Sequence, residues 1–73
     1  MKSLSEMNLN EICVVDKVLT VGSIKRRFTD IGLIEGTRVK CVGISPAGDP
    51  KAFLIRGAVI AIRINDGSQV IVR

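Results

Sequence analysis

The stretch from residue 24 to residue 39 constrains the fold most, because its apolar residues change their spacing part-way along. They first recur at the spacing of one helical face, at Ile24, Phe28 and Ile31. This spacing predicts a short helix over about Ile24–Ile31. Gly32 then occupies the position at which helices commonly end in a left-handed residue, so Leu33 is expected to pack back on Phe28. Beyond this stop the apolar period falls to two, which predicts a strand.

Strand patterns occupy most of the remaining chain, whose apolar residues are largely Ile and Val. Five strands are predicted, at Glu11–Leu19, Thr37–Ile44, Ala52–Arg56, Val59–Ile64 and residues 70–72. Turns are predicted at residues 45–50 and 66–68, which are rich in Pro, Gly, Asp and Ser. Thr20 or Ser23 is expected to cap the start of the helix.

Five short strands and one brief helix in a chain of 73 residues are typical of a small, strongly bent barrel of the SH3-like kind. We therefore predict a mainly β fold, with the helix between the first and second strands. Residues 1–73 are expected to form one domain, and residues 1–10 to be a polar lead-in with Leu4, Met7 and Leu9 as occasional anchors. Some apolar residues fall on the face predicted to point outward, namely Val42, Ile44, Leu54, Ile64 and Ile71. They indicate either bulges in the strands or an exposed apolar patch of the kind that marks a partner site.

The charge of the chain is moderately basic, with 11 Lys and Arg residues against 7 Asp and Glu residues and a formal net charge of +4. The cluster Lys25–Arg27 indicates a solvated helix face. Neither Phe is placed among exposed basic residues, so nucleic-acid binding is not expected. Arg27 and Arg56 are expected either to be solvated or to form weak surface ion pairs with Asp30 or Asp49.

The distribution of apolar residues predicts the compartment. No apolar run approaches the roughly 18 residues that a membrane span needs, so the protein is not expected to be inserted in a membrane. Residues 1–10 lack the apolar run of a secretory leader. We therefore expect a cytoplasmic protein in which both cysteines are reduced thiols.

Residues for catalysis or metal binding do not occur in any recognisable arrangement. With no His, no nucleophile beside a plausible base and no phosphate-binding glycine-rich loop, an enzymatic role is not expected. Cys13 and Cys41 lie 28 residues apart, which excludes the usual Cys/His spacings of zinc sites. Cys41 alternates with Val39 and is expected to be buried. We predict no cofactor and no metal ligands, with a weak site for iron or another transition metal left open at Asp49 or Glu35.

Three segments resemble those of the FeoA family, the small ferrous iron transport protein A. Arg26–Val39 (RRFTDIGLIEGTRV) resembles the helix-turn-strand signature of that family. Pro46–Pro50 (PAGDP) resembles its loop ending in Gly-Asp-Pro. Arg56–Arg63 (RGAVIAIR) resembles its Arg-Gly hairpin followed by an apolar-Ala-apolar-Arg strand. The resemblance is in the right order and covers roughly residues 12–73, nearly the whole chain.

The resemblance implies an SH3-like barrel in the cytosol, accessory to FeoB, a membrane ferrous-iron transporter that carries its own GTP-binding domain. It implies no catalytic residues. The same type of domain also occurs at the C-terminus of iron-dependent repressors. The chain departs from the family at Gly67-Ser68, where the family usually shows Ala, and at Ile44 and Ala47. These departures concern the local shape of the loop edge.

From the resemblance and the absence of catalytic groups we expect an adaptor that binds and modulates a FeoB-like transporter. The residues expected to contact this partner are Leu33, Ile34 and Glu35 after the helix, and Gly48 and Asp49 in the loop. Asp49 fits equally well a structural turn in which its side chain holds the backbone. Two alternatives stay open: a regulatory SH3-like module that acts with an iron-dependent transcription regulator, and a weak transition-metal-binding protein. The oligomeric state stays open as well.

Overall fold

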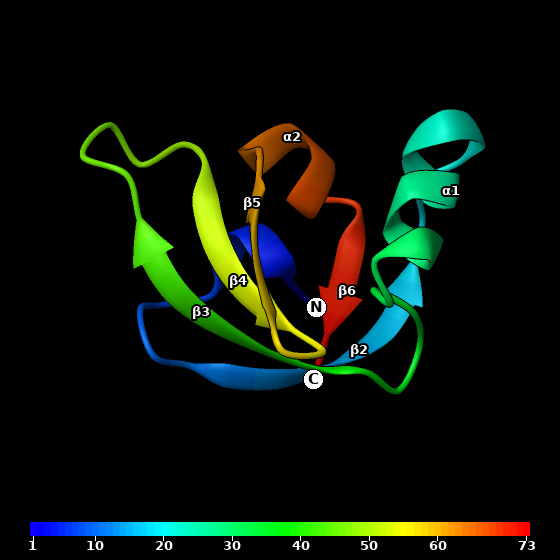
Figure 1. Cartoon of the computed structure of the whole chain (residues 1–73), viewed down its shortest axis with the longest axis horizontal. Coiled ribbons are helices and arrows are strands. Elements are labelled where there is room, and N and C mark those ends of the chain that lie inside the picture. The colour runs from blue at the N-terminus through cyan, green and yellow to red at the C-terminus, as the bar shows by residue number, and fades with distance from the viewer.

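A strongly bent, six-stranded antiparallel sheet forms the body of the structure (Figure 1). The computed structural model describes all residues from Met1 to Arg73. In chain order its elements are β1 (Lys2–Ser3), the 3-10 helix η1 (Leu4–Glu6), β2 (Ile12–Val18), α1 (Gly22–Asp30), β3 (Arg38–Ile44), β4 (Lys51–Ile55), β5 (Ala58–Ile62), α2 (Ile64–Gly67) and β6 (Val70–Val72). The helix α1 connects β2 to β3, as predicted.

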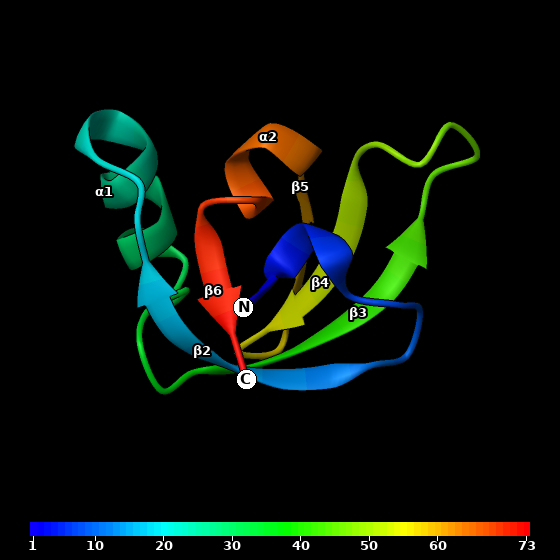
Figure 2. The same cartoon turned by 180° about the vertical axis from the view of Figure 1, so that it is seen from behind.

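The strands lie in the order β1-β6-β2-β3-β4-β5. The last strand of the chain therefore lies between the first two, and Lys2 pairs with Val72, so that the two ends of the chain are neighbours (Figure 2). Register shifts between Val15 and Lys17, and between Cys41 and Gly43, mark irregularities of the kind that bend a strand. The structure thus has the mainly β, bent architecture that the sequence predicts, with six strands in place of five.

The corner after α1 has the predicted geometry. Gly32 adopts a positive φ of 85°, which a glycine reaches without the steric cost of a Cβ. The N–H of Leu33 donates to the carbonyl of Phe28 at 2.8 Å, and the N–H of Gly32 donates to that of Thr29 at 3.0 Å. These two bonds form a Schellman motif, and both Phe28 and Leu33 are buried in the same core. The predicted end of the helix is confirmed.

The start of α1 differs from the prediction. The helix begins at Gly22, and the residue before it is Val21 in an extended conformation with no side-chain hydrogen bond to the helix. The predicted cap by Thr20 or Ser23 is therefore wrong. The hydroxyl of Thr20 is buried without a hydrogen-bond partner, and residue 20 lies in the connection between β2 and α1.

The segment predicted to be a polar lead-in is part of the core, which corrects the interpretation of residues 1–10. Leu4 and Met7 are fully buried. The 3-10 turn brings both residues inward, and Glu6 accepts a hydrogen bond from the N–H of Ser3 at 2.8 Å. From β4, the Lys51 ammonium donates to two carbonyls of this segment, those of residues 5 and 7, at 2.6 and 2.9 Å.

The C-terminal third contains a second helix where a turn was predicted. Strand β5 ends at Ile62, and residues 64–67 form α2. Of the apolar residues predicted to point outward, Ile44 and Leu54 are exposed, whereas Val42 and Ile64 are half-buried. Ile71 is buried although it lies outside the core cluster that contains its neighbours Val70 and Val72. The prediction for that residue is wrong.

The core lies inside the bend of the sheet and under α1. Its buried apolar residues come from the N-terminal segment, from α1 with the turn after it, and from β2 to β6. They are Leu4, Met7, Cys13, Val15, Phe28, Leu33, Val39, Cys41, Phe53, Ile55, Ile62, Val70 and Val72. The expected burial of Cys41 is confirmed.

Candidate functional site

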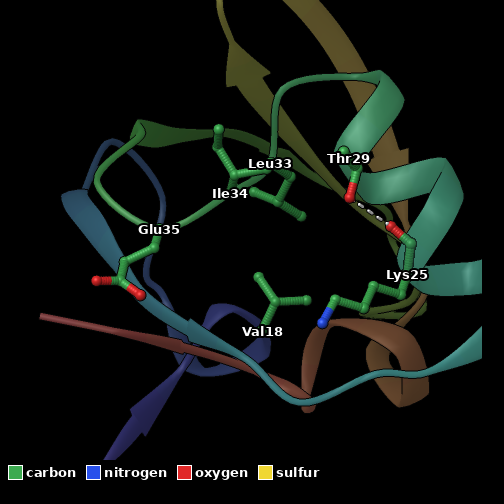
Figure 3. A pocket seen from close by; sticks show the side chains of 6 residues that line it. All are labelled: Val18, Lys25, Thr29, Leu33, Ile34 and Glu35. Carbon is green, nitrogen blue, oxygen red and sulfur yellow. Dashed lines mark hydrogen bonds between the residues drawn. The ribbon is translucent and has the colours of Figure 1, made fainter.

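A pocket between α1, the end of β2 and the turn that follows α1 contains part of the predicted partner site. We call it the α1–β2 pocket, and it has a volume of about 190 Å³. Its lining residues are Val18, Lys25, Thr29, Leu33, Ile34 and Glu35 (Figure 3). Leu33, Ile34 and Glu35, predicted from the sequence, thus lie together on one side of this pocket.

The turn beside the α1–β2 pocket is held in place by a dense set of hydrogen bonds. The N–H of Gly36 donates to the carbonyl of Val15 at 2.8 Å, and the N–H of Thr37 donates to that of Ile34 at 3.0 Å. The hydroxyl of Thr37 donates to the carbonyl of Gly32 at 2.8 Å. These bonds tie the turn to β2 and to the end of α1. The backbone of residues 34–37 is therefore held by bonds within the chain itself.

The side chains of this turn have different roles. Leu33 is buried and belongs to the core, so it forms an apolar floor rather than a contact surface. Ile34 is exposed over 40% of its surface. The exposed side chains of Lys25 and Glu35 line the pocket and belong to neither of the two ion pairs of the chain. The pocket therefore offers one exposed apolar side chain with a free cation and a free carboxylate.

The other two predicted residues lie elsewhere. Gly48 and Asp49 belong to the loop between β3 and β4, which lies at the opposite end of the long axis from α1 (Figures 1 and 2). The carboxylate of Asp49 accepts a hydrogen bond from the N–H of Ile64 at 3.0 Å, which ties the loop to the start of α2. The structure therefore does not join this loop and the α1–β2 pocket into one surface, and Asp49 has the structural contact that its alternative interpretation predicts.

Three residues of the pocket were missed in the sequence. Val18, Lys25 and Thr29 line it because α1 lies beside the end of β2, which is a tertiary arrangement. The one local signal was the spacing of four between Lys25 and Thr29, which places both on the same face of a helix. The hydroxyl of Thr29 donates to the carbonyl of Lys25 at 3.0 Å, so it is occupied within the helix.

The acidic and thiol groups of the chain are dispersed. No group of three or more Cys, Asp or Glu side chains is placed to hold a metal ion. Cys13 and Cys41 are buried free thiols, and burial raises the pKa of the Cys13 thiol. The two ion pairs join Lys2 to Glu11 and Arg73 to Asp16. Arg27 and Arg56 are exposed and belong to neither pair, so the solvated alternative holds for both. None of the helices is both long and apolar enough to cross a membrane.

Solved structures similar to this chain include FeoA proteins. The solution structure of FeoA from Chlorobium tepidum shares 28% sequence identity, with a TM-score of 0.93, over 99% of this chain and 69% of that one. The crystal structure of FeoA from Stenotrophomonas maltophilia, solved with zinc and described as an SH3 domain protein, shares 28% identity. Its TM-score is 0.88, over 100% of this chain and 91% of that one. The SH3-like fold predicted from the sequence is therefore confirmed.

A protein named IdeR shares the fold. The structure of IdeR from T. acidophilum has a TM-score of 0.83 over 94% of this chain and 32% of that one, at 17% identity, which shows a common fold and no more. No curated protein matches the chain in sequence. The family model described as the FeoA domain matches residues 2–73, and the chain belongs to the FeoA domain family, which is associated with ferrous iron transport.

Proposed function

We propose that the chain is a small cytoplasmic, non-enzymatic adaptor of ferrous iron uptake. In this proposal it binds and modulates a membrane transporter of the FeoB kind that has its own GTP-binding domain. Membership of the FeoA domain family supports the link to ferrous iron transport. The related protein of Stenotrophomonas maltophilia has been suggested to act as an activating factor of ferrous iron transport, which supports the same role here.

The main support for a docking site at this place is the turn beside the α1–β2 pocket, whose backbone is held by hydrogen bonds. A surface whose backbone is already held loses little conformational entropy when a partner binds. Ile34 supplies exposed apolar area at the rim, while Lys25 and Glu35 supply one charge of each sign to orient the partner. Gly48 and Asp49 lie too far along the molecule to belong to this contact, so we propose them as a separate partner surface of the same transporter.

The binding test uses the purified cytoplasmic domain of the FeoB-like transporter from the same cell, loaded with GDP or with a GTP analogue. We expect Ile34→Ser to weaken binding at least about tenfold, because the one exposed apolar contact of this pocket is lost. Ile44→Ser is the matched control, since Ile44 has nearly the same exposed fraction, 43% against 40%, at another place on the surface. Unchanged affinity of the Ile34→Ser protein would contradict this docking site, and no binding of the unaltered chain would contradict the function.

The cellular test measures ferrous iron uptake in a strain from which the gene has been deleted. We expect uptake to change on deletion, to be restored by the Ile44→Ser variant and not by Ile34→Ser. Duplex DNA is the negative control in the binding assay, because the chain provides no helix-turn-helix element to fill a major groove. Unchanged uptake in the deletion strain would argue against the adaptor, and tight DNA binding would favour the regulatory alternative.

We also propose that the adaptor needs no resident metal. The thiols of Cys13 and Cys41 are buried in the core, and the Asp49 carboxylate is bonded to α2. The relative from Stenotrophomonas maltophilia was solved with zinc, so zinc is the comparison metal. Equilibrium dialysis against iron(II) and zinc(II) is expected to retain neither at one ion per chain. Stoichiometric retention that Glu35→Gln or Asp49→Asn abolishes would establish the metal-binding alternative.

A further inference from the structure

A second surface, the outer-face patch, crosses the sheet on the side opposite the core. The register of the strands places its four residues side by side from β2 to β5. Ile12 pairs with Lys40, Lys40 with Leu54, and Leu54 with Val59. The residues that flank Lys40 and Leu54 along their strands are buried, as is Cys13 beside Ile12, so these three side chains point outward. Val59 is exposed and lies opposite Leu54 on the same face. Ile12, Leu54 and Val59 are exposed over 55, 37 and 66% of their surfaces, so this face exposes three apolar side chains, with Lys40 between Ile12 and Leu54.

The middle of the outer-face patch is hollow and cationic. A pocket of about 200 Å³ lies between Ile12 on β2 and Leu54 on β4. Arg38, Lys40 and Arg56 also line it, and no carboxylate does. Neither ion pair of the chain includes any of these three cations. These three cations therefore have no ion-pair partner within the chain.

Arg56 is positioned by the backbone of the corner after α1. The residue has a positive φ of 50° in the tight turn between β4 and β5. Its side chain lies across Gly32, where an added Cβ would collide with the Arg56 Cδ and lie 2.7 Å from Nε. The absence of a side chain at Gly32 thus lets the guanidinium group rest at the edge of the hollow. A cation held in this way loses less side-chain entropy when it pairs with a ligand.

We propose that the outer-face patch is a docking surface for an acidic amphipathic helix of a partner protein. An apolar side chain of that helix enters the hollow between Ile12 and Leu54, and its carboxylates pair with Arg38, Lys40 and Arg56. This surface shares no residue with the α1–β2 pocket, and the inference does not require that a transporter be the partner.

Charge and shape favour this occupant over two others. A second copy of the chain, packed face to face, would bring the same three cations against each other without a carboxylate in the lining, which is repulsive. A bilayer surface binds apolar side chains that protrude into it, whereas this patch has a hollow that receives a side chain. An acidic helix supplies both the missing negative charge and the side chain for the hollow.

The test is an NMR titration of the isotope-labelled chain with two synthetic peptides. One is a 14-residue amphipathic helix with Leu on one face and Glu on the flanks, and the other has every Glu replaced by Lys. We expect the acidic peptide to shift the amide signals of Ile12, Lys40, Leu54 and Val59, and added salt to weaken this binding. We expect the Lys peptide to leave these signals unchanged.

Two pairs of variants test the contacts. Leu54→Ser is expected to weaken binding of the acidic peptide about tenfold, while Leu19→Ser, at a Leu that is 51% exposed elsewhere, leaves it unchanged. Arg56→Glu is expected to weaken it at least as much, while Arg26→Glu on the exposed face of α1 does not. All four positions are exposed, so the variants should keep the fold, which the NMR spectrum itself reports.

Several results would overturn the inference. They are no shifts at millimolar acidic peptide, shifts confined to other residues, and equal binding of the Lys peptide. Binding to vesicles of phosphatidylglycerol without binding to the acidic peptide would assign the patch to a membrane surface instead. Because no transporter is present, a failure here is separate from a failure of the proposed adaptor function.

Discussion

At the residue scale, Glu11 holds the N-terminal segment to the start of β2. Its carboxylate pairs with the Lys2 ammonium and accepts a hydrogen bond from the N–H of Asn8 at 2.8 Å. The Cys13 thiol donates to the same group at 3.7 Å. The bond from Lys2 and then the bond from Asn8 lower the pKa of Glu11. The N–H of Ser3, which donates to Glu6, lowers the pKa of Glu6 in the same way.

These two carboxylates predict how stability depends on pH. Each has a pKa in the folded chain below its unfolded value of about 4.5. The stability that they contribute is therefore fully present above that pH and is lost as the pH falls through the folded pKa values. We expect urea unfolding at a series of pH values to show this acid loss, and Glu11→Gln to reduce it.

Glu35→Gln is the control for this series, because the Glu35 carboxylate accepts no hydrogen bond from the chain and forms no ion pair. We expect its acid dependence to match that of the unaltered protein. An acid dependence that persists unchanged in Glu11→Gln and in Glu6→Gln would show that other groups cause it.

At the scale of elements, α2 packs on η1 through a close contact at Gly67. A Cβ added at Gly67 would lie 2.5 Å from the hydroxyl oxygen of Ser5. That hydroxyl donates to the carbonyl of Ile64 at 2.7 Å, so it joins η1 to the first residue of α2. This contact gives a physical reason for glycine at position 67, where the resemblance described in the sequence analysis leads us to expect Ala. The small residue makes room for the hydroxyl.

A double-mutant cycle tests that contact. We expect Gly67→Ala alone to lower the free energy of unfolding by about 1 kcal/mol. The added methyl group would displace the Ser5 hydroxyl and break its hydrogen bond, and this loss exceeds the gain in helix propensity from Gly to Ala. In a Ser5→Ala background the same change should cost at least about 0.5 kcal/mol less, since no hydroxyl remains to be displaced. Urea unfolding of the four proteins measures both values. Strict additivity would show that the two residues are not coupled.

The elements that can be predicted from the sequence are those formed by interactions between residues close together in the chain. The helix before Gly32 and the turn after it follow from residues within one short stretch, and so does the placement of Ile34 beside the helix end. β1 and η1 were missed because two or three residues have no period, and Leu4 is buried only through contacts with the far end of the chain. The α1–β2 pocket was foreseen in part for the same reason: the turn is local, whereas Val18 reaches the pocket through packing.

At the scale of the whole molecule, the N-terminal segment closes one end of the core. Leu4→Ala is expected to lower the free energy of unfolding by about 2–5 kcal/mol, because Leu4 is fully buried and a cavity would remain. In so short a chain this is a large share of the total stability. Leu9→Ala is the matched control, since Leu9 is 53% exposed, and it should change stability by no more than about 0.5 kcal/mol. Chemical denaturation measures both changes in the free energy of unfolding. Equal effects would show that residues 1–10 are a lead-in and not part of the core.

The place of β6 in the sheet has a consequence for how the protein is made. Residues 70–72 lie between β1 and β2, so during translation the first strands emerge long before the strand that must separate them. The nascent chain can form the corner around α1, but its core stays open while those residues are still inside the ribosome. We therefore expect folding to be completed only once residues 70–72 have left the ribosome, in one cooperative step. Until then its Ile- and Val-rich strands are exposed to chaperones and to one another.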